Sequence, residues 1–162
     1  MAREALFNLL RTRVDLDEAN VVDLFSGTGF ISFEFCSRGA KHVTAVEKHR
    51  GCVKFITQTA ATLGISNLSV IQGDVFRFLK MGSSHADLVF ADPPYDLPNL
   101  SDLADTILEE NVLNPEGLLI IEHGKSTHFH THPCFQEERR YGSVHFSFFI
   151  APARPIAPRQ EL

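Results

Sequence analysis

The stretch from Leu88 to Tyr95 limits the fold of this chain more than any other part of the sequence. Its apolar first half, Leu88–Ala91, is typical of a strand buried on both faces, as strands of parallel sheets are. Asp92, Pro93 and Pro94 end that strand, because proline has no N–H for a sheet and the residue before a proline stays extended. Ligands of open α/β sheets bind at the carboxyl ends of the strands. The stretch therefore predicts an α/β fold with a stiff corner that faces a ligand.

This corner carries the groups needed to hold a planar amine. The Asp92 carboxylate and the carbonyl of the Asp92–Pro93 link are acceptors for both protons of an –NH2 group. Tyr95 offers a ring on which a base can stack, a contact worth about 1–3 kcal/mol. An exocyclic base amine is a poor nucleophile because its lone pair is delocalised, and acceptors on its protons would favour a pyramidal nitrogen. The alternative is a proline-rich turn after a core strand, without a catalytic role.

A glycine loop between a strand and a helix supplies the candidate cofactor site. We expect a strand over Val21–Phe25, a loop over Ser26–Gly29 and a helix over Phe30–Ser37. The loop glycines let the backbone approach a ligand, and the helix N-terminus adds unpaired N–H groups. Ser32 replaces the third glycine of a dinucleotide loop, and the acid Asp23 suits a cationic or zwitterionic ligand better than a pyrophosphate. A tight turn without a ligand is the alternative.

Acidic residues stand at the ends of four successive predicted strands: Asp23, Glu47, Asp74 and Asp92. Any one of them could be a strand end or a helix cap, but four in equivalent places indicate a common site. Glu47 ends the strand His42–Glu47, where an acid can bind the two hydroxyls of a ribose. Asp74 follows the strand Leu68–Gln72 and could accept a hydrogen bond from an adenine amine, with the Val75 N–H as a donor.

Helical and strand patterns alternate along the rest of the chain and end in a hairpin. Pairing of that hairpin with the sheet would make the sheet a mixed one. The further elements that we expect are helices over Ala2–Arg11, Arg50–Leu63 and Leu100–Glu110, a turn at Asn114–Gly117, a strand over Leu118–Glu122, and hairpin strands over Phe135–Tyr141 and Ser143–Ile150.

Two groups of basic side chains are expected on solvated surfaces rather than in sites. The first group is the arginines near the N-terminus: Arg3, Arg11 and Arg13. The second group is a histidine-rich loop with His123, His128, His130 and His132. Imidazole is a common metal ligand, but that loop has no acid or thiol at ligand spacing, so we expect no metal site.

The composition fits one cytoplasmic domain. The chain has 162 residues, 44% of them hydrophobic, which suffices for one core, and its apolar runs suit neither a membrane span nor a secretory signal. Cys36, Cys52 and Cys134 are widely spaced, which argues for reduced thiols. A net charge of −5 means that a nucleic acid would have to meet a local basic patch. We expect a domain over 1–150, with helix and linker over 1–19, and a flexible proline-rich tail over 151–162.

The motifs together resemble those of class I S-adenosylmethionine methyltransferases and, more narrowly, of the RsmD family, which methylates a guanine N2 of 16S ribosomal RNA. The resemblance extends from about Arg3 to Ile150. It rests on Arg3–Asn8, Asp23–Gly29, Ser37–Ala40, Glu47–Lys48, Gly73–Val75 and Phe90–Tyr95. It implies an α/β, single-domain, Rossmann-like class I methyltransferase fold, with a seven-stranded, mostly parallel sheet and a C-terminal antiparallel hairpin.

The resemblance also implies a role for each motif. The cofactor-binding residues would be Asp23, Phe25, Ser26, Gly27, Thr28, Gly29, Glu47, Lys48, Asp74, Val75 and Asp92. The catalytic residues would be Asp92, Pro93, Pro94 and Tyr95. The glycine loop would cradle the methionine part of S-adenosylmethionine, Glu47 the ribose, and Asp74 with Val75 the adenine. The catalytic corner would orient the guanine amine for a direct displacement that leaves S-adenosylhomocysteine and needs no metal.

The implied partner is 16S rRNA within the small ribosomal subunit, and the implied state is a monomer. Family members carry a basic, glycine-containing segment before the first helix, which has no counterpart here, so we expect weaker RNA binding. Two alternatives stay open. One is an amino-methyltransferase acting on DNA adenine or cytosine or on protein glutamine, and the other is a non-catalytic ribosome-assembly factor.

Overall fold

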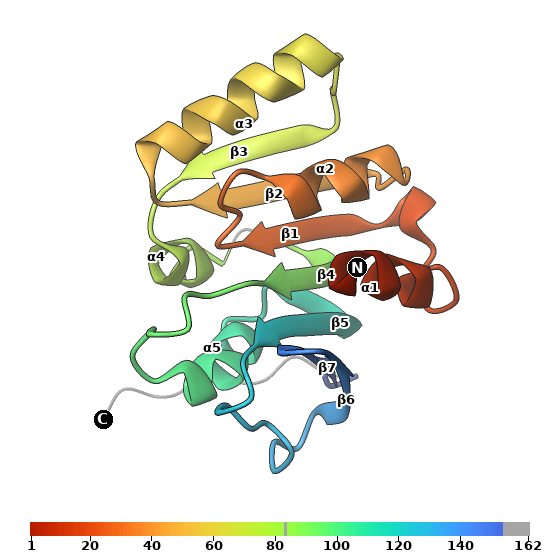
Figure 1. The fold of residues 1–162 in the computed structure, drawn as a ribbon, viewed down its shortest axis with the longest axis vertical. Coiled ribbons are helices and arrows are strands. Elements are labelled where there is room, and N and C mark those ends of the chain that lie inside the picture. Colours follow the sequence, from red (N-terminus) through yellow and green to blue (C-terminus); the bar gives the residue numbers. More distant parts are fainter. Residues whose placement is uncertain (83, 154–162) are drawn as a thin grey trace.

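The computed structural model describes residues 1–82 and 84–153, which form a seven-stranded sheet with helices on both faces (Figure 1). The strands are β1 (Asn20–Leu24), β2 (His42–Glu47), β3 (Leu68–Gln72), β4 (Ala86–Ala91), β5 (Leu113–His123), β6 (Phe135–Tyr141) and β7 (Val144–Ile150). The helices are α1 (Ala2–Leu10), α2 (Phe30–Ser37), α3 (Arg50–Leu63), α4 (Val75–Lys80) and α5 (Leu103–Glu109), with short 3-10 helices η1 (Leu16–Glu18) and η2 (Leu100–Asp102). Among the helices so described, none is long and apolar enough to cross a membrane.

The order of the strands in the sheet is β3-β2-β1-β4-β5-β7-β6. The first five strands are parallel, whereas β7 pairs antiparallel with both β5 and β6. This confirms the seven-stranded, mostly parallel sheet with a C-terminal hairpin. The carboxyl ends of the parallel strands meet at the left edge of the sheet in Figure 1. From β1 the chain adds β2 and β3 on one side and then β4 and β5 on the other, so the order of the strands reverses between β1 and β4. A switch of this kind leaves a crevice in which ligands bind.

Two apolar clusters cover the two faces of the sheet. On one face lie α1 and α2, whose Leu6, Phe7 and Phe35 are buried against apolar side chains of the strands. The rings of Phe7 and Phe35 meet edge to face with centroids 4.9 Å apart. On the other face lie α4 and α5 with the buried ring of Phe149. The helices therefore hold the sheet from both sides and leave its carboxyl edge open.

The structure departs from the predicted elements at three places. The helix α4 was not predicted, and the expected helix over Leu100–Glu110 divides into η2 and α5. The expected turn at Asn114–Gly117 instead lies inside β5, where the pairing with β4 shifts and Glu116 takes a φ of 64°. Ala151, the first residue of the predicted tail, is buried, and its N–H donates to the Gly117 carbonyl at 2.9 Å. The rest of the predicted tail, from 154 to 162, lies outside the described residues.

Candidate active site

A cleft of about 1250 Å³ opens at the carboxyl edge of the sheet. It joins the glycine loop and the proline corner, because Gly27 of the loop and Tyr95 of the corner both line it. The predicted site residues that line the cleft are Phe25, Gly27, Glu47, Lys48, Asp74, Val75, Asp92, Pro93, Pro94 and Tyr95. The other predicted ones, Asp23, Ser26, Thr28 and Gly29, lie outside this lining.

The glycine loop is held in shape by its own polar groups and by α3. The Ser26 hydroxyl lies 3.0 Å from the Asp23 carbonyl and 2.9 Å from the Val46 carbonyl, which ties the loop to β1 and β2. Gly29 has a φ of 86°, and a side-chain carbon there would lie 2.8 Å from Ile56 of α3. Only glycine combines this backbone conformation with so close a contact. Ser26 and Gly29 therefore shape the loop, while Gly27 faces the cleft.

Asp23 lies beneath the loop and is fully buried. Its Oδ2 accepts a hydrogen bond of 2.6 Å from the Ser32 hydroxyl, whereas its Oδ1 has no hydrogen-bond partner among the described residues. Burial raises the pKa of Asp23 to about 7. A buried carboxylate oxygen without a partner is costly, so a cationic group at this place would be stabilised.

Glu47 ends β2 with its carboxylate already oriented. Its Oε1 accepts from the Gly27 N–H at 3.1 Å, and its Oε2 accepts from the His49 N–H at 3.2 Å. A carboxylate has about four lone-pair positions, so each oxygen can still accept from a hydroxyl. Asp74 is the N-cap of α4, where its Oδ1 accepts from the Arg77 N–H at 3.1 Å, and it lines the same cleft with Val75.

The proline corner follows β4 as expected. The Asp92 N–H still donates to the Leu24 carbonyl of β1 at 3.3 Å, and the sheet pairing ends there. Pro93 is buried, whereas the Tyr95 side chain is exposed at the mouth of the cleft. Burial and the nearby carboxyl groups of Glu122 and Asp92 raise the pKa of Tyr95. The neutral tyrosine thus presents a ring beside the Asp92 acceptor.

Two charged residues of the cleft that lie next to Asp92 were not predicted as site residues from the sequence. Arg3, expected on a solvated face, instead places its Nη2 3.3 Å from Asp92 Oδ2 and 3.9 Å from Glu122 Oε2. Glu122, the end of the predicted fifth strand, is buried in the cleft lining. Burial and the adjacent Asp92 carboxyl raise its pKa. Acids at the ends of four predicted strands were assigned to one site, and the same reasoning would have added Glu122, at the end of the fifth.

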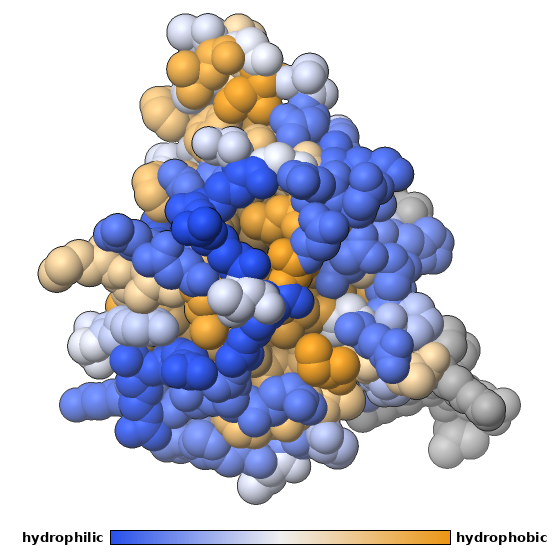
Figure 2. Space-filling view, turned by 90° about the vertical axis from the view of Figure 1, so that its right-hand side faces the viewer, coloured by the Kyte–Doolittle hydropathy of each residue, from blue (hydrophilic) through white to orange (hydrophobic). Residues whose placement is uncertain are grey.

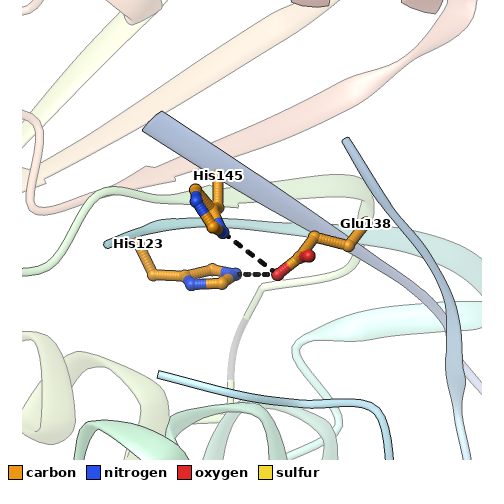
Figure 3. A group of neighbouring side chains, drawn as sticks. All are labelled: His123, Glu138 and His145. Carbon is orange, nitrogen blue, oxygen red and sulfur yellow. Dashed lines mark hydrogen bonds and ion pairs between the residues drawn. The ribbon is translucent and has the colours of Figure 1, made fainter. Parts of the chain in front are cut away.

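The histidines do not form one solvated loop. His123 belongs to β5 and is fully buried, so the expectation of a solvated loop is wrong for this residue. Its ring nitrogens lie 2.8 Å from the Gly124 carbonyl and 2.7 Å from the Ser147 hydroxyl. Figure 3 shows His123 and His145 converging on Glu138 of β6, at 3.7 Å and 3.3 Å. These three side chains lie close enough together to hold a metal ion.

The other histidines of the loop stay apart from this group. The rings of His128 and His130 stack on each other with centroids 6.1 Å apart, and His132 pairs with Asp105 of α5 at 2.8 Å. The predicted histidine cluster is thus divided between a buried strand end and a surface loop.

Similarity to known proteins extends over almost the whole chain. The family model described as conserved hypothetical protein 95 matches residues 1–150. The ribosomal RNA small subunit methyltransferase D of Buchnera aphidicola is 26% identical over 152 residues, which cover 91% of this chain and 77% of that protein. The protein of the same name from Haemophilus influenzae is 35% identical over 125 residues, covering 74% and 63%. The chain thus spans less than two thirds of the Haemophilus relative.

The solved structures include a methyltransferase candidate from Escherichia coli, yhhF, with a TM-score of 0.83 at 25% identity, covering 94% of this chain and 85% of that one. The sheet order and the crevice at its switch point agree with the class I methyltransferase fold. The region that the family model matches contains the whole cleft lining, from Met1 to Val144. The chain therefore belongs to the family described as conserved hypothetical protein 95, the RsmD-like methyltransferases.

Proposed function

We propose that this chain transfers a methyl group from S-adenosylmethionine to the exocyclic N2 amine of a guanine in 16S rRNA, within the small ribosomal subunit. The observation that carries the proposal is the shared cleft, in which Gly27 and Glu47 face the Asp92-Pro93-Pro94-Tyr95 corner. The names of the Buchnera and Haemophilus relatives support rRNA as the substrate class. We expect the protein to act as a monomer in the cytoplasm.

The cleft fits S-adenosylmethionine at several points. Beneath the glycine loop, behind the cleft lining, the unpartnered Oδ1 of Asp23 suits the ammonium group of the methionine part. The preoriented Glu47 carboxylate can accept from both ribose hydroxyls. Asp74 and Val75 would hold the adenine. When bound, the cofactor supplies an electrophilic methyl group on a sulfonium sulfur, which is a good leaving group.

The protein's own residues would act on the amine. The Asp92 carboxylate and the carbonyl of the Asp92–Pro93 link accept the two N–H protons, and Tyr95 stacks on the base. Pro93 is buried, so this acceptor pair is held in place before the base arrives. The amine would take up the methyl group together with its positive charge, and one of its two held protons would then leave through the Asp92 carboxylate to water. Positioning supplies much of the rate, and no enzyme nucleophile is required.

The experiment offers labelled S-adenosylmethionine with unmethylated small ribosomal subunits, 16S rRNA, DNA and a protein extract as separate substrates. We expect label in rRNA, in N2-methylguanine after digestion. Asp92→Ala should lower kcat by about 100-fold or more while the cofactor affinity changes little. Asp96→Ala is the matched control, since this exposed acid lies outside the cleft lining.

Each alternative has its own outcome in this experiment. Label in DNA or in glutamine, but not in rRNA, would favour the other amino-methyltransferases. A cofactor that binds without any transfer, together with an Asp92→Ala variant that still supports ribosome assembly, would favour the assembly factor.

A further inference from the structure

Glu122 and Asp92 are neighbouring carboxylates at the ends of two paired strands. Ile121 of β5 pairs with Ala91 of β4 in parallel register, so the next residue of each strand is one of these acids. The Glu122 side chain is 8% exposed and lines the cleft beside Asp92 and Tyr95. The mechanism proposed above uses Asp92 but leaves this second, more deeply buried acid without a role.

The two carboxylates already share a planar donor in the structure. The Arg3 guanidinium, from the first turn of α1, reaches over the exposed ring of Phe30 at 5.5 Å and places one nitrogen between Asp92 and Glu122. A guanidinium presents N–H groups on neighbouring nitrogens of one carbon, all in one plane. Both acids lie within 3.9 Å of the one nitrogen Nη2, so they are close enough together to accept from neighbouring donors of one planar group, and the Arg3 side chain, 41% exposed, can leave toward solvent.

Guanine carries the same N–C–N pattern on its Watson–Crick edge. Its N1–H and its N2 amine are donors on either side of C2. Beside the amine of adenine or cytosine, the ring nitrogen is instead an acceptor, which would face a carboxylate lone pair. A buried acceptor without a donor is costly. A second carboxylate beside the one that accepts from the amine therefore selects guanine over adenine and cytosine.

We propose that Glu122 accepts the N1–H of the target guanine while Asp92 holds its N2 amine, and that Arg3 occupies this place in the free enzyme and vacates it when the base enters. The proposal rests on the proposed function and assigns to it the residue that determines base specificity. Glu122 is then a base-reading residue, and the Arg3 guanidinium is an internal substitute for the guanine edge.

The test replaces the N1–H of the substrate. Ligation of a synthetic oligonucleotide places either guanine or 2-aminopurine at the labelled position of 16S rRNA. 2-Aminopurine keeps the N2 amine but has an unprotonated N1. The unmodified enzyme should prefer guanine by about 100-fold or more in kcat/KM. Glu122→Gln should reduce that preference to about 10-fold or less, because an amide can accept from guanine or donate to 2-aminopurine.

Two further variants complete the test. Glu122→Ala should lose activity on guanine without gaining any on 2-aminopurine, because it offers neither a donor nor an acceptor. Glu116→Gln, the same substitution at the opposite end of β5, should keep the full preference. Calorimetric titration with S-adenosylmethionine, expected to give the same affinity for all variants, shows that each one is folded.

The outcomes separate this inference from the proposed function. Label on guanine N2 with a preference that Glu122→Gln leaves intact would overturn the role of Glu122 alone. A preference of the unmodified enzyme for 2-aminopurine would show that Glu122 acts as a protonated donor, which also overturns it. Label on an adenine or cytosine amine would overturn both proposals.

Discussion

Asp23 is the most deeply buried acid of the site, which makes the stability of the protein depend on pH. Because burial raises its pKa from 3.8 to about 7, the folded state binds this proton more tightly than the unfolded state does. The resulting stabilisation is complete below about pH 4 and is lost as the pH rises through 7. Raised pKa values at Glu122 act in the same direction. We expect the free energy of unfolding to fall with pH across this window, by at most about 1.4 kcal/mol per pH unit per group.

Urea unfolding at several pH values between about 5 and 8 measures this effect. Asp23→Asn should flatten the dependence, because the amide does not titrate, while Asp96→Asn at an exposed position should leave it as it was. Identical pH profiles for the unmodified protein and Asp23→Asn would contradict the assignment.

At the residue scale, the sequence predicts acids at strand ends more readily than the partners of those acids. Glu47 and Asp74 lie in the cleft as predicted, because a parallel sheet brings its strand ends to one edge whatever the side chains do. Arg3 could not be placed in the same way. Its contact with Asp92 joins residues 89 positions apart and depends on how α1 packs on the sheet. Local patterns carry no information about such a contact.

At the scale of elements, the hairpin β6–β7 packs against β5 and buries a polar group made of His123, Glu138 and His145. The Gly124 carbonyl can only accept, so the Nδ1 of His123 donates to it, and its Nε2 accepts from the Ser147 hydroxyl. Burial lowers the pKa of His123, and Arg140 and His145 lower the pKa of Glu138 despite its burial. The neutral imidazole of His123 is thus satisfied by Gly124 and by Ser147 of β7, and the ionised carboxylate of Glu138 by Arg140 and His145 of the hairpin.

We propose that this group is a hydrogen-bond network rather than a metal site. Glu138→Gln should lower the free energy of unfolding by about 1–3 kcal/mol, because His145 and Arg140 lose a charged acceptor. Glu137→Gln, in the adjacent position on the same strand, removes more exposed ion pairs and should cost about 1 kcal/mol or less. In thermal unfolding, neither zinc nor a chelator should shift the Tm. A zinc-induced rise that Glu138→Gln abolishes would instead establish a metal site.

The elements themselves were predicted where their patterns are long. The strand β2 and the helix α3 have the predicted bounds, because each shows a full period of apolar residues and α3 ends at Gly64 in a left-handed conformation. The helix α4 was missed because its six residues are too few to show a helical period. The start of β5 was missed because Asn114–Gly117 has the composition of a turn, and only its neighbours β4 and Ala151 hold it in the sheet.

At the scale of the whole molecule, one face is suited to water or to polar partners. Figure 2, which views the molecule from the right-hand side of Figure 1, shows hydrophilic residues over most of that face, with apolar residues gathered mainly in a central hollow and at the upper end. Broad apolar patches mark protein partners, whereas this face is largely polar. Recognition of a nucleic acid must then depend on where the charges lie.

Charge at the cleft suits a cation better than a phosphate. The acids among the described lining residues are Glu4, Glu34, Glu47, Asp74, Asp92 and Glu122, and the Lys and Arg residues are Arg3, Arg38 and Lys48. Two of these bases are paired, Arg3 with Asp92 and Arg38 with Glu34. With a net charge of −5 on the chain, the field favours a sulfonium cofactor and opposes the RNA backbone.

We therefore expect RNA binding by this chain to depend only weakly on salt. Each phosphate neutralised contributes about −0.7 to −0.9 to the slope of log K against log salt concentration, so contacts by the cleft bases would give a slope of about −3 or shallower. Fluorescence anisotropy of a labelled 16S rRNA fragment at several salt concentrations measures this slope, and cofactor titration at the same concentrations is the control. A slope of about −6 or steeper would contradict the expectation. It would mean that a phosphate-binding surface away from the cleft brings the RNA to the enzyme, and that the cleft only selects the base.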